Sequence, residues 1–451
     1  MPRHGRHPPD RPYDRTGFQT PPIDSVAATT AGGHPGERTD RRSRVIRPPS
    51  PSMTIRVNSV ICGIFHYRKY IGDYSRSGQL QAFYYSHRRS TTAETLGIVS
   101  GKAINLWLKE YLLASAYRLP AQWRAHDRIG PTVHRWWERQ VLRRWIPCDL
   151  LHLHLLGTAN RVLDRARSEG AVTMGEPVMC HPVTLDRILA EEHDLLGIPR
   201  QRLDLLFASL VEEIPKCDYL VAGSRAVRDS YVARGYPSDR IRAISYGVDA
   251  TRFTPLSEAE KAACADGKFR VICVAQITPR KGIHYLLEAW ARLGLPANES
   301  ELLLVGPVAE SLEPVMRRYA GSYTHLPHVP HERLRFYYGK SSVFVLPSVE
   351  DGFGLVTAEA MACGLPVVVS DAAGSADLVE HGVSGFVVPS RSAEAIMEAL
   401  DTLYRDPERR VAMGRRSLAL CGAHDWSAFA SQLAAYHRDA VESRTGGVAA
   451  R

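Results

Sequence analysis

Residues 351–368 have the sequence DGFGLVTAEAMACGLPVV, which holds two carboxylates, two closely spaced glycines and a run of helix-forming residues. The glycines allow a tight turn that exposes backbone N–H groups. A helix is expected over 355–363, and the glycine and proline that follow end it. The exposed N–H groups then lie at a helix N-terminus, whose partial positive charge favours an anion. The stretch therefore predicts a phosphate site flanked by Asp351 and Glu359.

The rest of the chain alternates predicted strands and helices, as an α/β protein does. From Met53 onward, strand-like apolar runs alternate with amphipathic stretches, which is the pattern of parallel sheets wrapped by helices. A chain of 451 residues is too long for one ordinary core and suggests about two domains. One helix is expected over 103–117. Strands are expected near 59–65, 150–155, 219–222, 269–275, 302–305 and 343–346.

The composition argues against several classes of protein. It is 44% hydrophobic and 23% charged, as in a globular protein, and no apolar run approaches the roughly 18 to 20 residues that cross a membrane. The N-terminus lacks the apolar core of a secretory signal, so we expect a cytoplasmic protein. The eight cysteines form no C-x-x-C pair, which argues against a zinc site or a disulfide framework.

Residues 1–52 differ from the rest. They hold nine Arg and no Lys against five Asp plus Glu, are rich in Pro, Gly and Ser, and show no apolar period. This composition is typical of disorder. We expect a leader without an enzymatic role, or an upstream start codon chosen in error, rather than a nucleic-acid-binding arm. No nucleic acid partner is expected.

The segment 351–359 resembles the E-x7-E motif of retaining family-4 glycosyltransferases, with Asp351 in place of the first Glu and Glu359 as the second. The resemblance implies that Asp351 and the amides of Gly352, Phe353 and Gly354 bind the hydroxyls and diphosphate of the donor sugar. It also implies that Glu359 accepts hydrogen bonds from the ribose. Asp in place of Glu keeps the charge but shortens the reach.

A second segment, QITPRKG at 276–282, resembles the phosphate clamp of the same family. Lys281 stands where the family has its lysine, while Gln276 replaces the usual arginine five positions earlier. A neutral amide can donate a hydrogen bond to phosphate but carries no charge, so either Arg280 supplies that charge or the diphosphate is bound less tightly. No metal or other cofactor is expected, because Lys281 and the loop amides face the leaving group.

Three histidines and two glutamates are further polar candidates. His181 resembles the family histidine that faces the cleft from the N-terminal domain and touches the donor sugar, and a purely structural histidine is the alternative. We expect His152 and His154 to point to opposite faces of one strand, so that at most one, His154, reaches the cleft. Glu191 and Glu192 are expected on a solvated helix face and receive no role.

Over 53–440 the resemblance implies the GT-B fold, an α/β architecture in which two Rossmann-like doubly wound domains face each other across a cleft. The expected order is a disordered leader at 1–52, an N-terminal acceptor-binding Rossmann-like domain at 53–255, a C-terminal nucleotide-sugar-binding Rossmann-like domain at 256–425, a helix at 426–441 that crosses back to the N-terminal domain, and a disordered tail at 442–451.

The resemblance also implies an activity. The chain is expected to be a retaining glycosyltransferase of the hexosyltransferase type, with His181, Asp351 and Glu359 as its catalytic residues. It would move a sugar from an NDP-sugar to a carbohydrate or lipid-linked acceptor in the synthesis of cell-envelope polysaccharide, exopolysaccharide or glycolipid. The alternatives are a nucleotide-sugar epimerase or hydrolase of the same fold, and a non-catalytic nucleotide-sugar-binding protein. The departures at Asp351 and Gln276 keep the last alternative open.

One stretch bears on membranes. Residues 134–145 are basic and aromatic, and Trp137, Val141 and Trp145 lie on one helical stripe. Such a helix can lie on an anionic lipid surface. A stripe that packs into the core is the commoner arrangement, so peripheral contact with the inner membrane surface is a second hypothesis.

Overall fold

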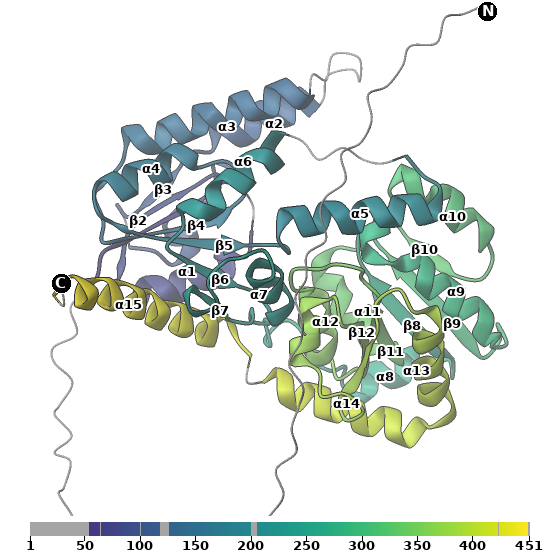
Figure 1. The fold of residues 1–451 in the computed structure, drawn as a ribbon. Coiled ribbons are helices and arrows are strands. Elements are labelled where there is room, and N and C mark those ends of the chain that lie inside the picture. Colours follow the sequence, from purple (N-terminus) through teal and green to yellow (C-terminus); the bar gives the residue numbers. More distant parts are fainter. Residues whose placement is uncertain are drawn as a thin grey trace, which may run out of the picture. The chain divides into compact units, whose positions relative to one another are not determined.

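A computed structural model describes residues 54–63, 65–99, 101–117, 126–199, 205–422 and 424–449 (Figure 1). The predicted leader at 1–52 lies outside these residues. Two parallel sheets organise the part of the chain that is described.

The first sheet has seven strands in the order β3-β2-β1-β4-β5-β6-β7, and every neighbouring pair is parallel. The strand order reverses between β1 and β4, which is the switch point where doubly wound folds bind ligands. The strands are β1 (Val57–Ile61), β2 (Leu80–Tyr85), β3 (Ala103–Asn105), β4 (Leu150–Leu155), β5 (Val172–Pro177), β6 (Tyr219–Ala222) and β7 (Ile241–Ala243). The first half of the chain is the part that forms this sheet together with the helices between its strands. These helices are α1 (Tyr67–Arg76), α2 (Leu108–Tyr117), α3 (His126–Arg143), α4 (Asn160–Ser168), α5 (Pro182–Leu196), α6 (Leu205–Glu213) and α7 (Arg225–Val232).

The second sheet has six parallel strands in the order β10-β9-β8-β11-β12-β13. Its central strands are apolar at nearly every position, because helices cover both faces of a parallel sheet. The strands are β8 (Phe269–Val274), β9 (Ser300–Val305), β10 (Thr324–Leu326), β11 (Val343–Leu346), β12 (Val367–Ser370) and β13 (Gly385–Val388). The helices are α8 (Glu258–Cys264), α9 (Ile283–Leu293), α10 (Glu313–Arg318), α11 (Leu334–Gly339), α12 (Leu355–Ala362), α13 (Ala393–Arg405) and α14 (Pro407–Cys421). The predicted α/β class with two doubly wound sheets is confirmed.

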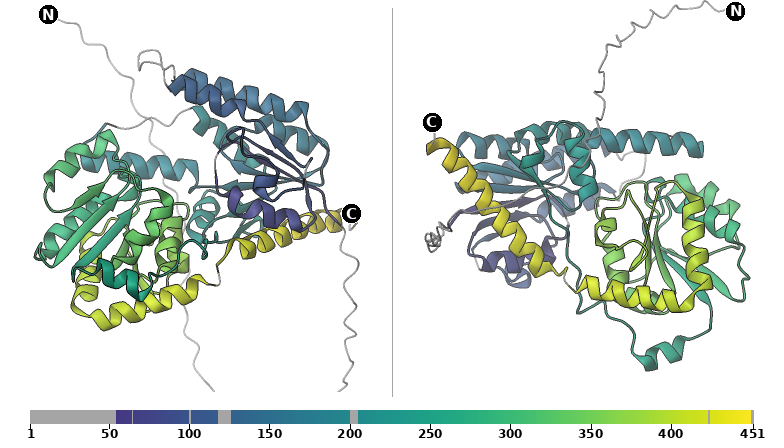
Figure 2. Two further views of the ribbon diagram at one scale, coloured as in Figure 1. Left: turned by 180° about the vertical axis from the view of Figure 1, so that it is seen from behind. Right: turned by 60° about the horizontal axis from the view of Figure 1, so that its bottom comes forward.

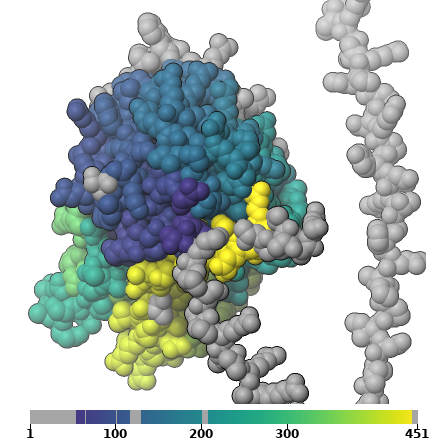
Figure 3. Space-filling view, turned by 90° about the vertical axis from the view of Figure 1, so that its left-hand side faces the viewer, coloured from purple at the N-terminus to yellow at the C-terminus, as the bar shows by residue number. Residues whose placement is uncertain are grey.

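The last helix, α15 (Trp426–Ala449), packs along α1 of the first half. Figures 2 and 3 show this yellow helix beside the purple start of the chain. Phe429 lies edge-on to Tyr70, with 4.9 Å between ring centroids. The helix continues past the predicted end at 441, so most of the expected tail at 442–451 is helical. Contact with the first half persists there, because Arg444 donates to the carbonyl of Ala171 at 2.9 Å.

Two further predictions can be compared with the structure. The helix expected over 103–117 was wrong in its first residues, because Ala103–Asn105 pairs with β2 as an edge strand and α2 begins only at Leu108.

In the basic and aromatic stretch at 134–145, Trp137 and Val141 are fully buried, so this stripe packs into the core. Among the described residues, no helix combines the length and apolar character needed to cross a membrane.

Candidate functional site

The donor loop, residues 347–354, joins β11 to α12. Gly354 caps α12 with a φ of 83°, a conformation that glycine adopts without strain. A Cβ at Gly352 would lie 2.1 Å from the carbonyl oxygen of Val178, so only glycine fits where the loop meets the first half. Within the described residues, the N–H groups of Gly352, Phe353 and Gly354 donate to no protein acceptor. They are therefore available to an anion at the N-terminus of α12.

Two ion pairs flank this loop. The ammonium of Lys281 donates to Asp351, and both side chains are mostly buried. Nη1 of Arg280 lies 2.8 Å from Oε2 of Glu350. Arg280 and Lys281 belong to the short turn η5 (Pro279–Lys281), which follows β8 and precedes α9. The clamp segment and the donor loop are thus neighbours at the carboxyl edge of the second sheet.

Glu359 is oriented by two donors. Its Oε1 lies 2.9 Å from Nε2 of His331, and its Oε2 lies 3.3 Å from the hydroxyl of Tyr338. Nη1 of Arg252 lies 3.1 Å from Nδ1 of His331. Because arginine can only donate, Nδ1 accepts and Nε2 carries the proton donated to Glu359. Burial, together with the nearby Glu359 carboxylate, holds the pKa of Tyr338 well above its usual range, so its hydroxyl stays a donor.

Two cavities adjoin at this edge, since His66 and Leu355 line both. The smaller one, about 300 Å³, is lined by a set that includes Gln276, Arg280, Lys281, Asp351, Phe353 and Gly354. The larger one, about 490 Å³, is lined by Glu359 and His331 and, from the first half, by Lys69. The structure therefore brings most of the residues predicted from the two motifs to two adjoining cavities.

His181 does not line either cavity. It caps the N-terminus of α5, where its Nδ1 accepts from the N–H of Val183 at 3.3 Å. Its ring lies edge-on to Tyr231, with 5.1 Å between centroids, and burial lowers its pKa. The structure thus gives His181 a local capping contact, and the predicted contact with the donor sugar stays a prediction.

The two histidines of β4 share one face of the strand. Nε2 of His152 and Nε2 of His154 each lie 3.1 Å from Oε2 of Glu176. The expectation of opposite faces was wrong, because residues two apart in a strand point the same way. Although burial raises it, the neighbouring His154 and His152 hold the pKa of Glu176 well below its usual range. Neither histidine lines the two cavities.

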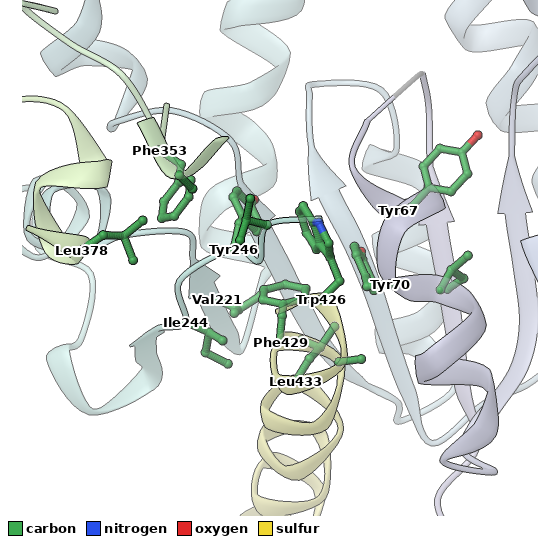
Figure 4. Close-up of a cluster of buried hydrophobic side chains, with 14 of the residues drawn as sticks. Tyr67, Tyr70, Val221, Ile244, Tyr246, Phe353, Leu378, Trp426, Phe429 and Leu433 are labelled. Atoms are coloured by element: carbon green, nitrogen blue, oxygen red, sulfur yellow. The ribbon is translucent and has the colours of Figure 1, made fainter. Parts of the chain in front are cut away.

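Sequence reasoning missed residues of the first half that reach the site. His66 follows β1 and lines both cavities, and burial lowers its pKa to about 4. Its position just after the first strand of a doubly wound sheet was the available signal. Tyr246 lies edge-on to Phe353 with 5.3 Å between centroids, and its hydroxyl donates to Glu176 at 2.7 Å (Figure 4).

Direct hydrogen bonds also join the first half to the donor loop. The hydroxyl of Ser224 donates to the carbonyl of Gly352 at 2.8 Å. The N–H of Cys180 donates to Oε1 of Glu350 at 3.0 Å. Both halves of the chain therefore shape the loop that would meet a phosphate.

Two family models match the chain. The model described as Glycosyl transferases group 1 matches residues 257–418, and the model described as Glycosyltransferase Family 4 matches residues 107–252. The first match contains the clamp segment and the donor loop, and the second lies in the first half.

Curated relatives have glycosyltransferase names. A D-inositol 3-phosphate glycosyltransferase of Pseudarthrobacter chlorophenolicus is 32% identical over 224 residues, which are 47% of this chain and 53% of that protein. A GDP-mannose-dependent alpha-(1-6)-phosphatidylinositol monomannoside mannosyltransferase of Mycolicibacterium smegmatis is 31% identical over 217 residues, which are 44% of this chain and 56% of that protein. The chain spans about half the length of the curated relatives it matches.

Solved structures share the fold. Sucrose-phosphate synthase from Thermosynechococcus elongatus matches with a TM-score of 0.61 at 20% identity. The match covers 86% of this chain and 100% of the synthase chain. Anabaena HepE in complex with UDP-glucose has a TM-score of 0.56 at 16% identity and covers 84% of this chain and 98% of its own. These likenesses concern the fold alone and confirm the predicted GT-B architecture.

Proposed function

Because the chain belongs to the group 1, family-4 glycosyltransferases of the GT-B fold, we propose that it transfers a sugar from an NDP-sugar to an acceptor hydroxyl with retention of configuration. One observation carries the proposal: Lys281 and the donor loop line one cavity, and Glu359 lines a second cavity that shares His66 and Leu355 with the first. A cation, unbonded N–H groups and an oriented carboxylate are what a nucleoside diphosphate needs.

The donor would lie along the two adjoining cavities. Its diphosphate would accept hydrogen bonds from the loop N–H groups and from Lys281, whose present partner Asp351 would then turn to the sugar hydroxyls. Its ribose would donate to Glu359, which His331 and Tyr338 already orient. No metal ion is needed in this proposal, because fixed donors face the charge that develops on the leaving group.

In the proposed reaction the acceptor oxygen attacks the sugar on the face from which the leaving group departs. The acceptor oxygen bonds to the anomeric carbon on the side from which the nucleoside diphosphate leaves. The bond between that carbon and the β-phosphate oxygen breaks, and the proton of the acceptor hydroxyl passes to the departing phosphate. Lys281 and the N–H groups of 352–354 would stabilise the charge on that phosphate in the transition state.

The acceptor is proposed to be a carbohydrate or a glycolipid used in cell-envelope synthesis. The names of the relatives support this class, since one is a D-inositol 3-phosphate glycosyltransferase and another a phosphatidylinositol monomannoside mannosyltransferase. The acceptor would enter from the first half, where His66 and Lys69 line the larger cavity.

The test uses radiolabelled UDP-, GDP- and ADP-sugars with a cell-envelope extract as acceptor. A transferase gives a labelled glycosylated product, an epimerase gives a new sugar nucleotide, a hydrolase gives free sugar, and a binding protein gives none of these. Thermal stabilisation by each nucleotide finds the donor base, since ligand at 100 times its dissociation constant adds about 2.7 kcal/mol. A folded protein that yields no glycosylated product with any donor would refute the proposal.

Peripheral membrane contact is proposed for α2 rather than for the buried stripe of α3. Leu108, Tyr111 and Leu112 lie on one face of α2 and are 41%, 51% and 41% exposed. The guanidinium of Arg89 stands 5.6 Å from the ring of Trp107 beside them, so the surface joins apolar and cationic groups. Such a surface suits anionic lipid.

Flotation with vesicles tests this contact. Tyr111→Ser with Leu112→Ser should abolish binding to vesicles that contain phosphatidylglycerol. Val411→Ser, which changes an exposed apolar residue on α14, serves as the matched control. Equal flotation of the double variant and the control would contradict the contact.

A further inference from the structure

Helix α5 follows a strand of the first sheet but packs on the second half of the chain. It lies against η5, the turn that carries Arg280 and Lys281. Leu196, at its C-terminal end, packs against the core of the second half. Figures 1 and 2 show α5 beside the helices of that half. The helix therefore connects the two halves close to the donor site.

Glu192 fastens the C-terminal part of α5. Its side chain is 0% exposed. Its carboxylate accepts from Nε2 of His284 at 3.1 Å, from the hydroxyl of Tyr285 at 3.3 Å and from Nε of Arg391 at 2.6 Å. The solvated face expected for Glu191 and Glu192 was therefore wrong for Glu192, because the second half covers it. A buried carboxylate with three donors is costly to disrupt.

The partners of Glu192 lie next to the clamp lysine. His284 and Tyr285 belong to the first turn of α9, which begins at Ile283, directly after Lys281 and Gly282. A carboxylate at this end of α9 is also favoured by the helix dipole. Glu192 thus holds the segment that places the Lys281 ammonium.

The N-terminal end of α5 is held as well. The N–H of Cys180, two residues before the helix, donates to Oε1 of Glu350 at 3.0 Å. Glu350 precedes Asp351 in the donor loop and also binds Arg280. Both ends of α5 are therefore tied to residues that border the diphosphate subsite.

The backbone of Arg391 supports the same conclusion. Its φ is 66°, and among the residues that the structure describes it is the only non-glycine with a positive φ. Its guanidinium reaches two neighbouring acidic residues of α5, with Nη1 2.9 Å from Glu191 and Nε 2.6 Å from Glu192. Such a conformation persists only where the surrounding contacts over-determine it. Contact with α5 is one such constraint.

We propose that Glu192 is a positioning residue: by binding the first turn of α9 and Arg391, it docks α5 on the second half and fixes Lys281 at the diphosphate subsite. The docking stands on the contacts alone. Its catalytic consequence rests on the proposed function, because that function assigns Lys281 to the phosphate.

Hydrogen exchange on the full chain tests the docking without any ligand. In Glu192→Ala, amides of 182–196 and of 283–287 should exchange about tenfold faster, because opening of the docked helix becomes easier. Asp186→Ala is the matched control, since it removes an exposed carboxylate from the same helix. Wild-type exchange of both segments in Glu192→Ala would overturn the proposal.

A double-mutant cycle, measured by kcat, tests whether Glu192 acts through Lys281. With the NDP-sugar that supports transfer, Glu192→Ala should lower kcat about tenfold while the Kd of the nucleoside diphosphate changes less than about twofold. In a Lys281→Ala background the same change should cost less than about twofold, because the positioned group is gone. Fully additive losses would refute the positioning role. If no donor is turned over, the proposed function fails while the exchange experiment still decides the docking.

Arg391→Gly provides a second route if Glu192→Ala does not fold. It removes the guanidinium from the opposite side and accepts the positive φ without strain. The same two segments should exchange faster than in the control. Unchanged exchange in this variant would count against the proposal equally.

Discussion

Nη1 of Arg280 lies 2.8 Å from Oε2 of Glu350, and the other oxygen of that carboxylate accepts from the backbone N–H of Cys180. Arg280 therefore belongs to a bridge between the donor loop and the first half. It also lines the smaller cavity, where Gln276 leaves the clamp without the charge that an arginine would bring. The same guanidinium can serve both purposes, because it carries five N–H donors.

The first prediction concerns Gln276, which stands where the family has an arginine. If Arg280 supplies the missing charge, Lys281→Ala and Arg280→Ala should each lower turnover roughly ten- to a hundredfold, since a charge-assisted phosphate contact is worth about 1.5 to 3 kcal/mol. Gln276→Arg should change little or reduce turnover, because a third cation crowds the site. Steady-state kinetics with the matching donor measures each effect.

A control separates the phosphate role of Arg280 from its bridge. Glu350→Gln removes the charge that Arg280 neutralises, so Arg280→Ala in that background leaves no unpaired buried carboxylate. A silent Arg280→Ala together with tighter diphosphate binding by Gln276→Arg would show that Lys281 acts without help.

The second prediction compares the two carboxylates of the motif. Glu359→Ala should weaken nucleoside diphosphate binding more than Asp351→Ala, because the ribose hydroxyls lose a buried charged acceptor worth about 1.5 to 3 kcal/mol. Calorimetric titration measures both variants, with Glu332→Ala, which removes an exposed carboxylate next to His331 in the chain, as control. Unchanged affinity in Glu359→Ala would remove the basis for the donor-site assignment.

The third prediction concerns metal ions. Turnover should survive EDTA, because in the proposed complex Lys281 and the N–H groups at 352–354, which have no protein acceptor among the described residues, would bind the leaving diphosphate. The measurement compares initial rates before and after dialysis against chelator. Lost turnover that manganese or magnesium restores would contradict it.

The fourth prediction is a pH dependence of stability. Burial lowers the pKa of His66 to about 4, so the folded state binds this proton less readily than the unfolded chain. The free energy of unfolding should therefore fall as the pH drops from about 6.5 towards 4, by up to about 1.4 kcal/mol per pH unit for this group. His437, whose pKa burial also holds well below its usual range, adds to the same trend.

Urea unfolding at several pH values between 7.5 and 5.0 measures this slope. His66→Asn should make it shallower, because one buried neutral histidine no longer titrates in the unfolded chain. The groups that face His66 are His154, Glu176, Asp351 and Lys69, and none of them is changed in this variant. An identical slope in His66→Asn would mean that His66 titrates alike in both states.

Much of the architecture and of the donor site could be predicted from the sequence because it is set locally. The alternation of apolar strands and amphipathic helices reflects burial on both faces of parallel sheets, and it predicted two doubly wound domains. The glycine turn before α12 is marked by residues adjacent in the sequence, so exposed N–H groups at 352–354 were expected before any packing was known.

The tertiary structure alone decided which polar side chains are buried together. From its position in an amphipathic helix, Glu192 was expected on the surface, and only the packing of α5 on the second half gives its carboxylate three donors. Glu176 contacts His152 and His154 of β4 and Tyr246 of a second, distant segment, so no spacing along the chain reveals the cluster. The edge strand β3 and the part of α15 around Arg444 likewise have partners far away in sequence. Local propensity sets where a strand or helix can form, whereas a charge is buried only where distant segments supply the donors that replace water.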